Sequence, residues 1–177
     1  SNGIWLMNSN YNSVFGINLT NNSYGIYLCG SSNNNLSDNI IAGNNYEGIC
    51  LEGSSYNNVH ENNINITGDI EAGCGIMLAC SYNNVSGNAV TATEGWGIML
   101  GGSNNTLRNN NMTNSVFNFA VVGWEEKNFW GFVHDVDISN TVNGKPVYYW
   151  VNRQQAIVPT DAGYVALVKC TNVTVKG

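Results

Sequence analysis

No lysine and no arginine occurs before Arg108 in this chain of 177 residues. Seven acidic side chains lie in that same stretch, whereas the rest of the chain carries all six basic groups against five acids. A surface of this sign repels the phosphates of nucleic acids and of anionic membranes. The sequence therefore predicts no nucleic-acid partner and no attachment to an anionic bilayer.

Other common signals are missing as well. No run of 18 apolar residues exists, so we expect no membrane span. No segment shows a sustained helical period. The cysteines lack the C-x-x-C spacing typical of metal sites, and we expect small buried or half-buried thiols. They are Cys29, Cys50, Cys74, Cys80 and Cys170.

What the chain does contain is a repeat of the form Gly-Ile-x-Leu. Its five copies begin at Gly3, Gly25, Gly48, Gly75 and Gly97, which gives a period of roughly 22 residues with one longer step before Gly75. A degenerate sixth copy is expected one period further on, at Phe119-Ala120-Val121-Val122. A period of this length predicts a solenoid.

Apolar anchors recur at fixed places within each repeat. The Ile and Leu are two residues apart, so in a strand they share one face. A second anchor follows at Val14, Leu36, Val59, Val85 and Leu107, and a third at Leu19, Ile41, Ile64, Val90 and Met112. Three short strands per coil, stacked so that equivalent strands pair, predict an all-β parallel β-helix with one continuous core.

Asparagine recurs in the same register. Two residues before the second anchor stand Asn12, Asn34, Asn57, Asn83 and Asn105, and three residues after it stand Asn39, Asn62, Asn88 and Asn110. Stacked Asn side chains can hydrogen-bond to their equivalents one coil away. We therefore expect asparagine ladders at the turns.

The repeat changes character towards the C-terminus. Asn143-Gly144 is a strong two-residue hairpin signal, with Pro146 to Trp150 as the returning strand. We expect parallel β-helix coils over residues 1–134, an aromatic-rich hairpin insertion over 135–162, and a resumed coil over 163–177 that continues in a longer parent chain.

The coils, together with Asn140–Trp150 and Asp161–Leu167, resemble the NosD-type right-handed parallel β-helix proteins. Such modules are numerous on archaeal cell surfaces and belong to a wider group of carbohydrate-binding proteins and sugar hydrolases, while NosD itself is associated with copper delivery. The resemblance covers essentially the whole chain. It implies a right-handed solenoid and an extracellular or cell-envelope location, and leaves enzyme, binding and structural roles open.

Three sets of side chains are candidate sites. Trp5 and Tyr27 on one outer face could stack on sugar rings. The edge carboxylates Glu47, Asp69, Glu71 and Glu94 could form a hydrolase pair or hold calcium, or could simply be a solvated acidic rim. The outward residues Cys50, Met77 and Met99 form a soft-ligand set suited to Cu(I), or else an apolar outer stripe.

The absence of basic side chains before Arg108 argues against polysaccharide lyase chemistry on the coils. We favour a non-enzymatic extracellular module without a required cofactor, which binds glycans or builds the cell envelope by stacking with copies of itself or neighbouring domains. Abundant Asn and Ser with little Lys suits that location. Candidate glycosylation sequons lie at Asn18, Asn21, Asn65, Asn104 and Asn111, whereas those at Asn35 and Asn84 are expected to lie in the ladder, where a glycan would clash.

Overall fold

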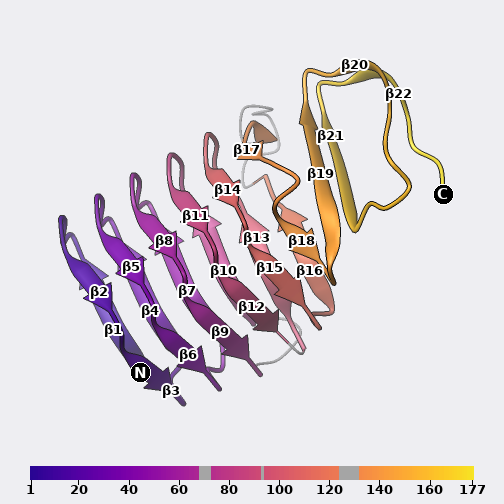
Figure 1. The fold of residues 1–177 in the computed structure, drawn as a ribbon. Coiled ribbons are helices and arrows are strands. Elements are labelled where there is room, and N and C mark those ends of the chain that lie inside the picture. The colour runs from indigo at the N-terminus through magenta and orange to yellow at the C-terminus, as the bar shows by residue number, and fades with distance from the viewer. Residues whose placement is uncertain (68–72, 93, 124–131) are drawn as a thin grey trace.

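The computed structural model describes residues 1–67, 73–92, 94–123 and 132–177. Along these residues the chain forms short strands joined by turns and bends, and it contains no α-helix. Equivalent strands of successive coils lie side by side along the axis of a parallel β-solenoid (Figure 1). The all-β parallel solenoid predicted from the repeat is therefore confirmed.

Three sheets make up the stack. Sheet A contains β1 (Asn2–Met7), β4 (Tyr24–Cys29), β7 (Glu47–Glu52), β10 (Cys74–Ala79), β13 (Trp96–Leu100) and β16 (Phe117–Val121). Sheet B contains β2 (Ser13–Phe15), β5 (Asn35–Ser37), β8 (Asn58–His60), β11 (Asn84–Ser86), β14 (Thr106–Arg108) and β17 (Asp135–Val136). Sheet C begins with β3 (Asn18–Thr20), β6 (Ile40–Ala42), β9 (Asn63–Ile66), β12 (Ala89–Ala92) and β15 (Asn111–Thr113).

The repeated apolar residues form vertical columns inside the stack. Ile26 pairs with Ile49 and Leu28 with Leu51, and all four side chains are 0% exposed. Burying one such side chain contributes about 1.5 to 3 kcal/mol. The core is therefore a stack of similar apolar layers, and each layer is closed by the coils on either side.

The first asparagine ladder closes the turn between sheets A and B. The Oδ1 atom of Asn34 accepts from the backbone N–H of Asn12 at 2.8 Å, and Asn83 Oδ1 accepts from that of Asn57 at the same distance. The column continues through Asn105 to His134, whose Nδ1 lies 3.4 Å from the Asn105 backbone nitrogen. The predicted ladder is confirmed.

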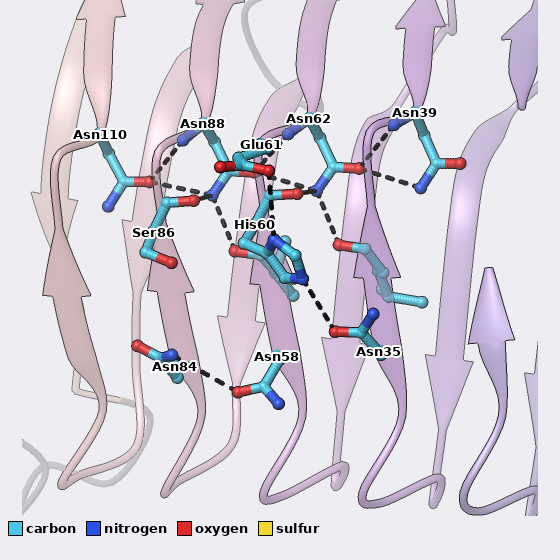
Figure 2. Close-up of polar contacts among 12 residues, drawn as sticks. Asn35, Asn39, Asn58, His60, Glu61, Asn62, Asn84, Ser86, Asn88 and Asn110 are labelled. Carbon is cyan, nitrogen blue, oxygen red and sulfur yellow. Dashed lines mark hydrogen bonds and ion pairs between the residues drawn. The ribbon is translucent and has the colours of Figure 1, made fainter. Parts of the chain in front are cut away.

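A second ladder closes the turn between sheets B and C, and Figure 2 shows its central part. Each Asn Nδ2 donates to the Oδ1 of the next Asn, at 2.9 Å from Asn39 to Asn62 and 3.0 Å from Asn62 to Asn88. The ladder extends one coil further than expected, because Asn110 Nδ2 donates to Asn140 Oδ1 at 2.8 Å. All of these residues are buried, so the ladder satisfies polar groups that water cannot reach.

The repeated glycine has a packing role in sheet A. A Cβ added at Gly48 would lie 2.6 Å from the carbonyl oxygen of Gly75 and 2.5 Å from Cγ2 of Ile64. Gly25 and Gly75 meet the same obstruction from the glycine of the next coil. Only a residue without a side chain lets successive coils approach this closely.

The sixth copy of the repeat lies one residue earlier than expected. Phe119 pairs with Ile98, Ala120 with Met99 and Val121 with Leu100, so the outward position falls at Ala120 and not at Val121. The turns that lead into this coil are thus shorter by one position than those of the preceding step. Phe119 is 5% exposed and fills the core column, which sets the register.

The C-terminal part begins with strands that belong to the stack. β17 joins sheet B and β18 (Thr141–Val142) joins sheet C, so the stack reaches into the range 135–162 that we assigned to the insertion. β18 then pairs antiparallel with β19 (Lys145–Val151) through Asn143 and Gly144, whose φ values of 50° and 76° give the expected tight hairpin.

Beyond the hairpin, the chain forms the strands drawn in orange and yellow at the far end of the molecule (Figure 1). β19 pairs in parallel with β21 (Tyr164–Val168), which extends sheet C, while β20 (Gln154–Ile157) pairs with β22 (Thr171–Thr174). The division of the chain into domains stays a prediction.

Candidate functional site

The outer face of sheet A carries most of the predicted site residues. Because equivalent strand positions pair between coils, outward side chains form rows along the stack. The central row is Trp5, Tyr27, Cys50, Met77, Met99 and Ala120, and a flanking row is Asn2, Tyr24, Glu47, Cys74, Trp96 and Phe117. The central row therefore changes from aromatic side chains to sulfur-containing ones before it ends at Ala120, whereas the flanking row ends in the stacked rings of Trp96 and Phe117.

Four aromatic rings form a connected surface on the first coils, which we call the aromatic platform. Trp5 stacks on Tyr27 with ring centroids 6.4 Å apart and planes 13° apart, and Tyr24 stacks on Tyr27 at 5.2 Å. Tyr24 also contacts Tyr46, which precedes β7, at 5.6 Å. Trp5 is 56% exposed and Tyr46 is 44% exposed. The platform thus joins the two predicted residues to two that the repeat pattern did not reveal.

The carboxylate of Glu52 orients one ring of the platform, that of Tyr27. The Tyr27 hydroxyl donates a hydrogen bond to Oε2 of Glu52, one coil away. This bond, with burial and the nearby carboxylate charge, raises the pKa of Tyr27 well above its ordinary value. A ring fixed at its hydroxyl keeps one orientation, which preorganises the platform and the rings stacked on it.

The sulfur side chains occupy the next part of the central row. Cys50 pairs with Met77, and Met77 with Met99, so the three predicted side chains do stand in a row. However, Cys50 is only 2% exposed, and burial raises the pKa of its thiol far above the ordinary value. A protonated, buried thiol must lose its proton before it can bind a metal.

Glu47 lies beside this row, in β7. Its side chain is half-buried, and its Oε2 atom has no hydrogen-bond partner. Burial raises the pKa of Glu47 to about 7. The carboxyl is therefore partly protonated near neutral pH, unlike an ordinary surface glutamate.

The predicted acidic group stays a prediction, because the structure describes only two of its four members. Glu94 is exposed in a turn before β13, and Asp69 and Glu71 lie outside the described residues. Glu52 stands at the opposite end of the strand from Glu47, which places their Cα atoms about 16 Å apart at roughly 3.3 Å per residue. Within the described part of the chain, no three His, Cys, Asp or Glu side chains are grouped to hold a metal.

The five glycosylation candidates all have exposed side chains. They are Asn18, Asn21, Asn65, Asn104 and Asn111. Asn35 and Asn84 point outward from sheet B next to the buried ladder (Figure 2), and Asn84 donates a hydrogen bond to its equivalent Asn58 one coil away. The expected clash of a glycan at these two positions stays a prediction. The ladder positions are the preceding residues, Asn34 and Asn83.

The stacked coils and their asparagine ladders define the class of this protein, a parallel β-solenoid repeat protein. The family model described as "Periplasmic copper-binding protein (NosD)" matches residues 1–150, so the chain belongs to the NosD family. The description of this family gives a periplasmic location. No curated protein and no solved structure matches the chain. None of the described residues form a helix that could cross a membrane.

Proposed function

We propose that this chain is a non-enzymatic module of the cell envelope that binds carbohydrate through the aromatic platform. The observation that carries the proposal is the connected stacking of Trp5, Tyr27, Tyr24 and Tyr46 on a solvent-facing sheet. Flat aromatic faces accept the apolar C–H faces of sugar rings, and neighbouring polar groups accept or donate hydrogen bonds to the hydroxyls. The description of the family as periplasmic supports the envelope location.

The charge of the coils selects the kind of glycan. Residues 1–107 carry seven acids and no Lys or Arg, so a uronic-acid polymer would be repelled from this surface. A neutral polysaccharide meets no such repulsion. The proposal is therefore for neutral glycans.

A structural role belongs to the same proposal. Copies of a parallel solenoid can associate end to end, because the strands of one coil present the same pairing geometry as the strands of the next. Electron microscopy of the native envelope material would show filaments or sheets if copies stack, and separate particles if they do not.

Calorimetric titration of the protein with neutral hexasaccharides tests the binding role. Trp5→Ala should weaken binding at least tenfold, because it removes the most exposed platform ring. Phe15→Ala is the matched control, since Phe15 is a 67% exposed aromatic of the same coil on sheet B. Equal affinities for the two variants would contradict the proposal, and release of reducing sugar by the wild type would show hydrolysis instead.

Copper handling is the second candidate, favoured by the row of Cys50, Met77 and Met99 and by the family's description. Thiolate and thioether sulfurs suit Cu(I), and strands about 4.8 Å apart place neighbouring sulfurs within reach of one ion. Because the pKa of the Cys50 thiol is raised, binding would release a proton and strengthen as the pH rises.

A thermal melt with Cu(I) tests this candidate. Copper should raise the melting temperature of the wild type, and Cys50→Ser combined with Met99→Leu should abolish that rise. Met7→Leu is the matched control, because Met7 is exposed on the same face outside the row. A copper-induced shift that survives in the double variant would end the idea.

A further inference from the structure

Tyrosines occupy an unusual backbone position at the corner between sheets A and B. One turn residue per coil has a left-handed φ there, between 55° and 60°, in the column Tyr11, Asn33, Tyr56, Tyr82 and Asn104. Asn33 and Asn104 show that asparagine fills this position well, as is typical of left-handed residues. Tyrosine is rarely found in this conformation, because its Cβ crowds the backbone. The turn itself therefore does not explain three tyrosines.

The rings do not contribute to the core either. Tyr11 is 81% exposed, Tyr56 59% and Tyr82 49%. Tyr56 and Tyr82, from adjacent coils, stack with centroids 5.3 Å apart and planes 13° apart. A strained backbone that holds exposed, ordered side chains is a feature of functional sites.

Amide side chains follow the stacked rings closely in the sequence. Two residues after each tyrosine, Asn58 and Asn84 point outward from sheet B (Figure 2). Asn84 Nδ2 donates to Asn58 Oδ1 at 3.4 Å, which leaves the Asn58 amide N–H groups and the Asn84 carbonyl oxygen facing solvent. Each of two successive coils thus presents one ring and one amide in the same order, Tyr56-Asn57-Asn58 and Tyr82-Asn83-Asn84.

We propose that Tyr56, Tyr82, Asn58 and Asn84 form a second carbohydrate-binding surface, on which a neutral glycan chain lies along the solenoid axis. Sugar rings stack on the exposed tyrosines, and sugar hydroxyls hydrogen-bond to the amides. The surface contains no charged side chain of its own, which fits a neutral ligand. It shares its ligand class with the proposed function but uses none of the platform residues.

The column of left-handed turn residues suggests a variant that removes the two rings without disturbing the turn. Tyr56→Asn combined with Tyr82→Asn installs the residue that Asn33 and Asn104 already use at this position. The variant removes both rings and relieves the backbone strain, so its melting temperature should be unchanged or higher. Tyr56→Phe combined with Tyr82→Phe keeps the stack and is the matched control.

Binding is measured by calorimetric titration with cellohexaose, chitohexaose and mannohexaose, in a Trp5→Ala, Tyr27→Ala background that disables the platform. We expect one of these probes to bind in this background, the Asn variant to weaken that binding at least tenfold, and the Phe variant to retain it. Absence of binding by all three probes in this background, equal binding by the Asn variant, or a lower melting temperature of the Asn variant would each overturn the proposal. The platform proposal fails separately, if Trp5→Ala and Tyr27→Ala change nothing in the otherwise native chain.

Discussion

The side-chain carbonyl oxygen of Asn57 accepts two hydrogen bonds from Asn34. Asn57 Oδ1 accepts from the Asn34 backbone N–H at 2.8 Å and from its Nδ2 at 3.1 Å. Both residues are 1% exposed, so water cannot replace either bond. Asn83 repeats the arrangement on Asn57. The turn of each coil is therefore completed by the side chain of the next.

Substitution of a ladder residue should lower the free energy of unfolding much more than substitution of its exposed neighbour. Asn57→Ala leaves the buried backbone N–H of Asn34 without a partner and removes the bonds that Asn57 Nδ2 donates to Ser54 and Ser55. We expect a loss of about 2 to 4 kcal/mol in the free energy of unfolding, measured by urea denaturation. Asn58→Ala, one residue on but exposed, should change it by less than about 0.5 kcal/mol. Similar losses in the two variants would contradict a structural role for the ladder.

The repeated glycines of sheet A allow a second test of the close contact between coils. Urea denaturation measures how much stability is lost when a methyl group is added there. Gly48→Ala places a methyl group against the Gly75 carbonyl and Ile64, so we expect a loss of about 3 kcal/mol. Gly53→Ala meets nothing within 4 Å but has a φ of +55°, so its loss should be about 1 kcal/mol from backbone strain. If both variants lost the same amount, the coils would not be in the close contact described.

Glu47 makes stability depend on pH. Burial raises its pKa from 4.5 to about 7 in the folded protein, so the folded state keeps a proton that the unfolded chain has lost. This carboxyl therefore contributes stability below about pH 4.5 that is lost as the pH rises to about 7. The shift corresponds to about 3 kcal/mol between pH 4.5 and pH 8, and solvent screening of the half-buried side chain lowers this. Glu47→Gln should therefore remove the pH dependence and gain about 2 kcal/mol over the wild type at pH 8 compared with pH 4.5.

Urea denaturation at these two pH values measures the Glu47 effect. Glu61→Gln, at an exposed carboxyl, controls for the loss of one negative charge. Parallel pH curves for wild type and Glu47→Gln would show that Glu47 is not buried as described.

The sequence was sufficient to predict the solenoid, because fixed spacings translate directly into columns. Ile26 pairs with Ile49, and Asn34, at the same spacing from Asn57, bonds to it. Such contacts repeat between neighbouring coils, so every copy of the repeat predicts the same pairing. The hairpin at Asn143-Gly144 was equally accessible, because its turn demands two residues that tolerate positive φ.

Other features depend on information that spacing does not carry. The step into the last coil of sheet A is one residue shorter, because a turn can lose a residue while Phe119 still fills the Ile column. Tyr24 and Tyr46 join the platform through ring contacts between different rows, which depend on side-chain rotamers. The burial of Cys50 on an outward row also depends on its neighbours and not on its own position.

The central claim, that the aromatic platform binds a neutral glycan, is tested most directly by an NMR titration of the ¹⁵N-labelled chain with neutral hexasaccharides. The account predicts saturable shifts of the Trp5 indole N–H and of the amides of Tyr24, Tyr27 and Tyr46, with the sugar recovered intact. Unchanged Trp5 and Tyr27 signals at saturating sugar, or shifts confined to the surroundings of Cys50 and Met77, would contradict it.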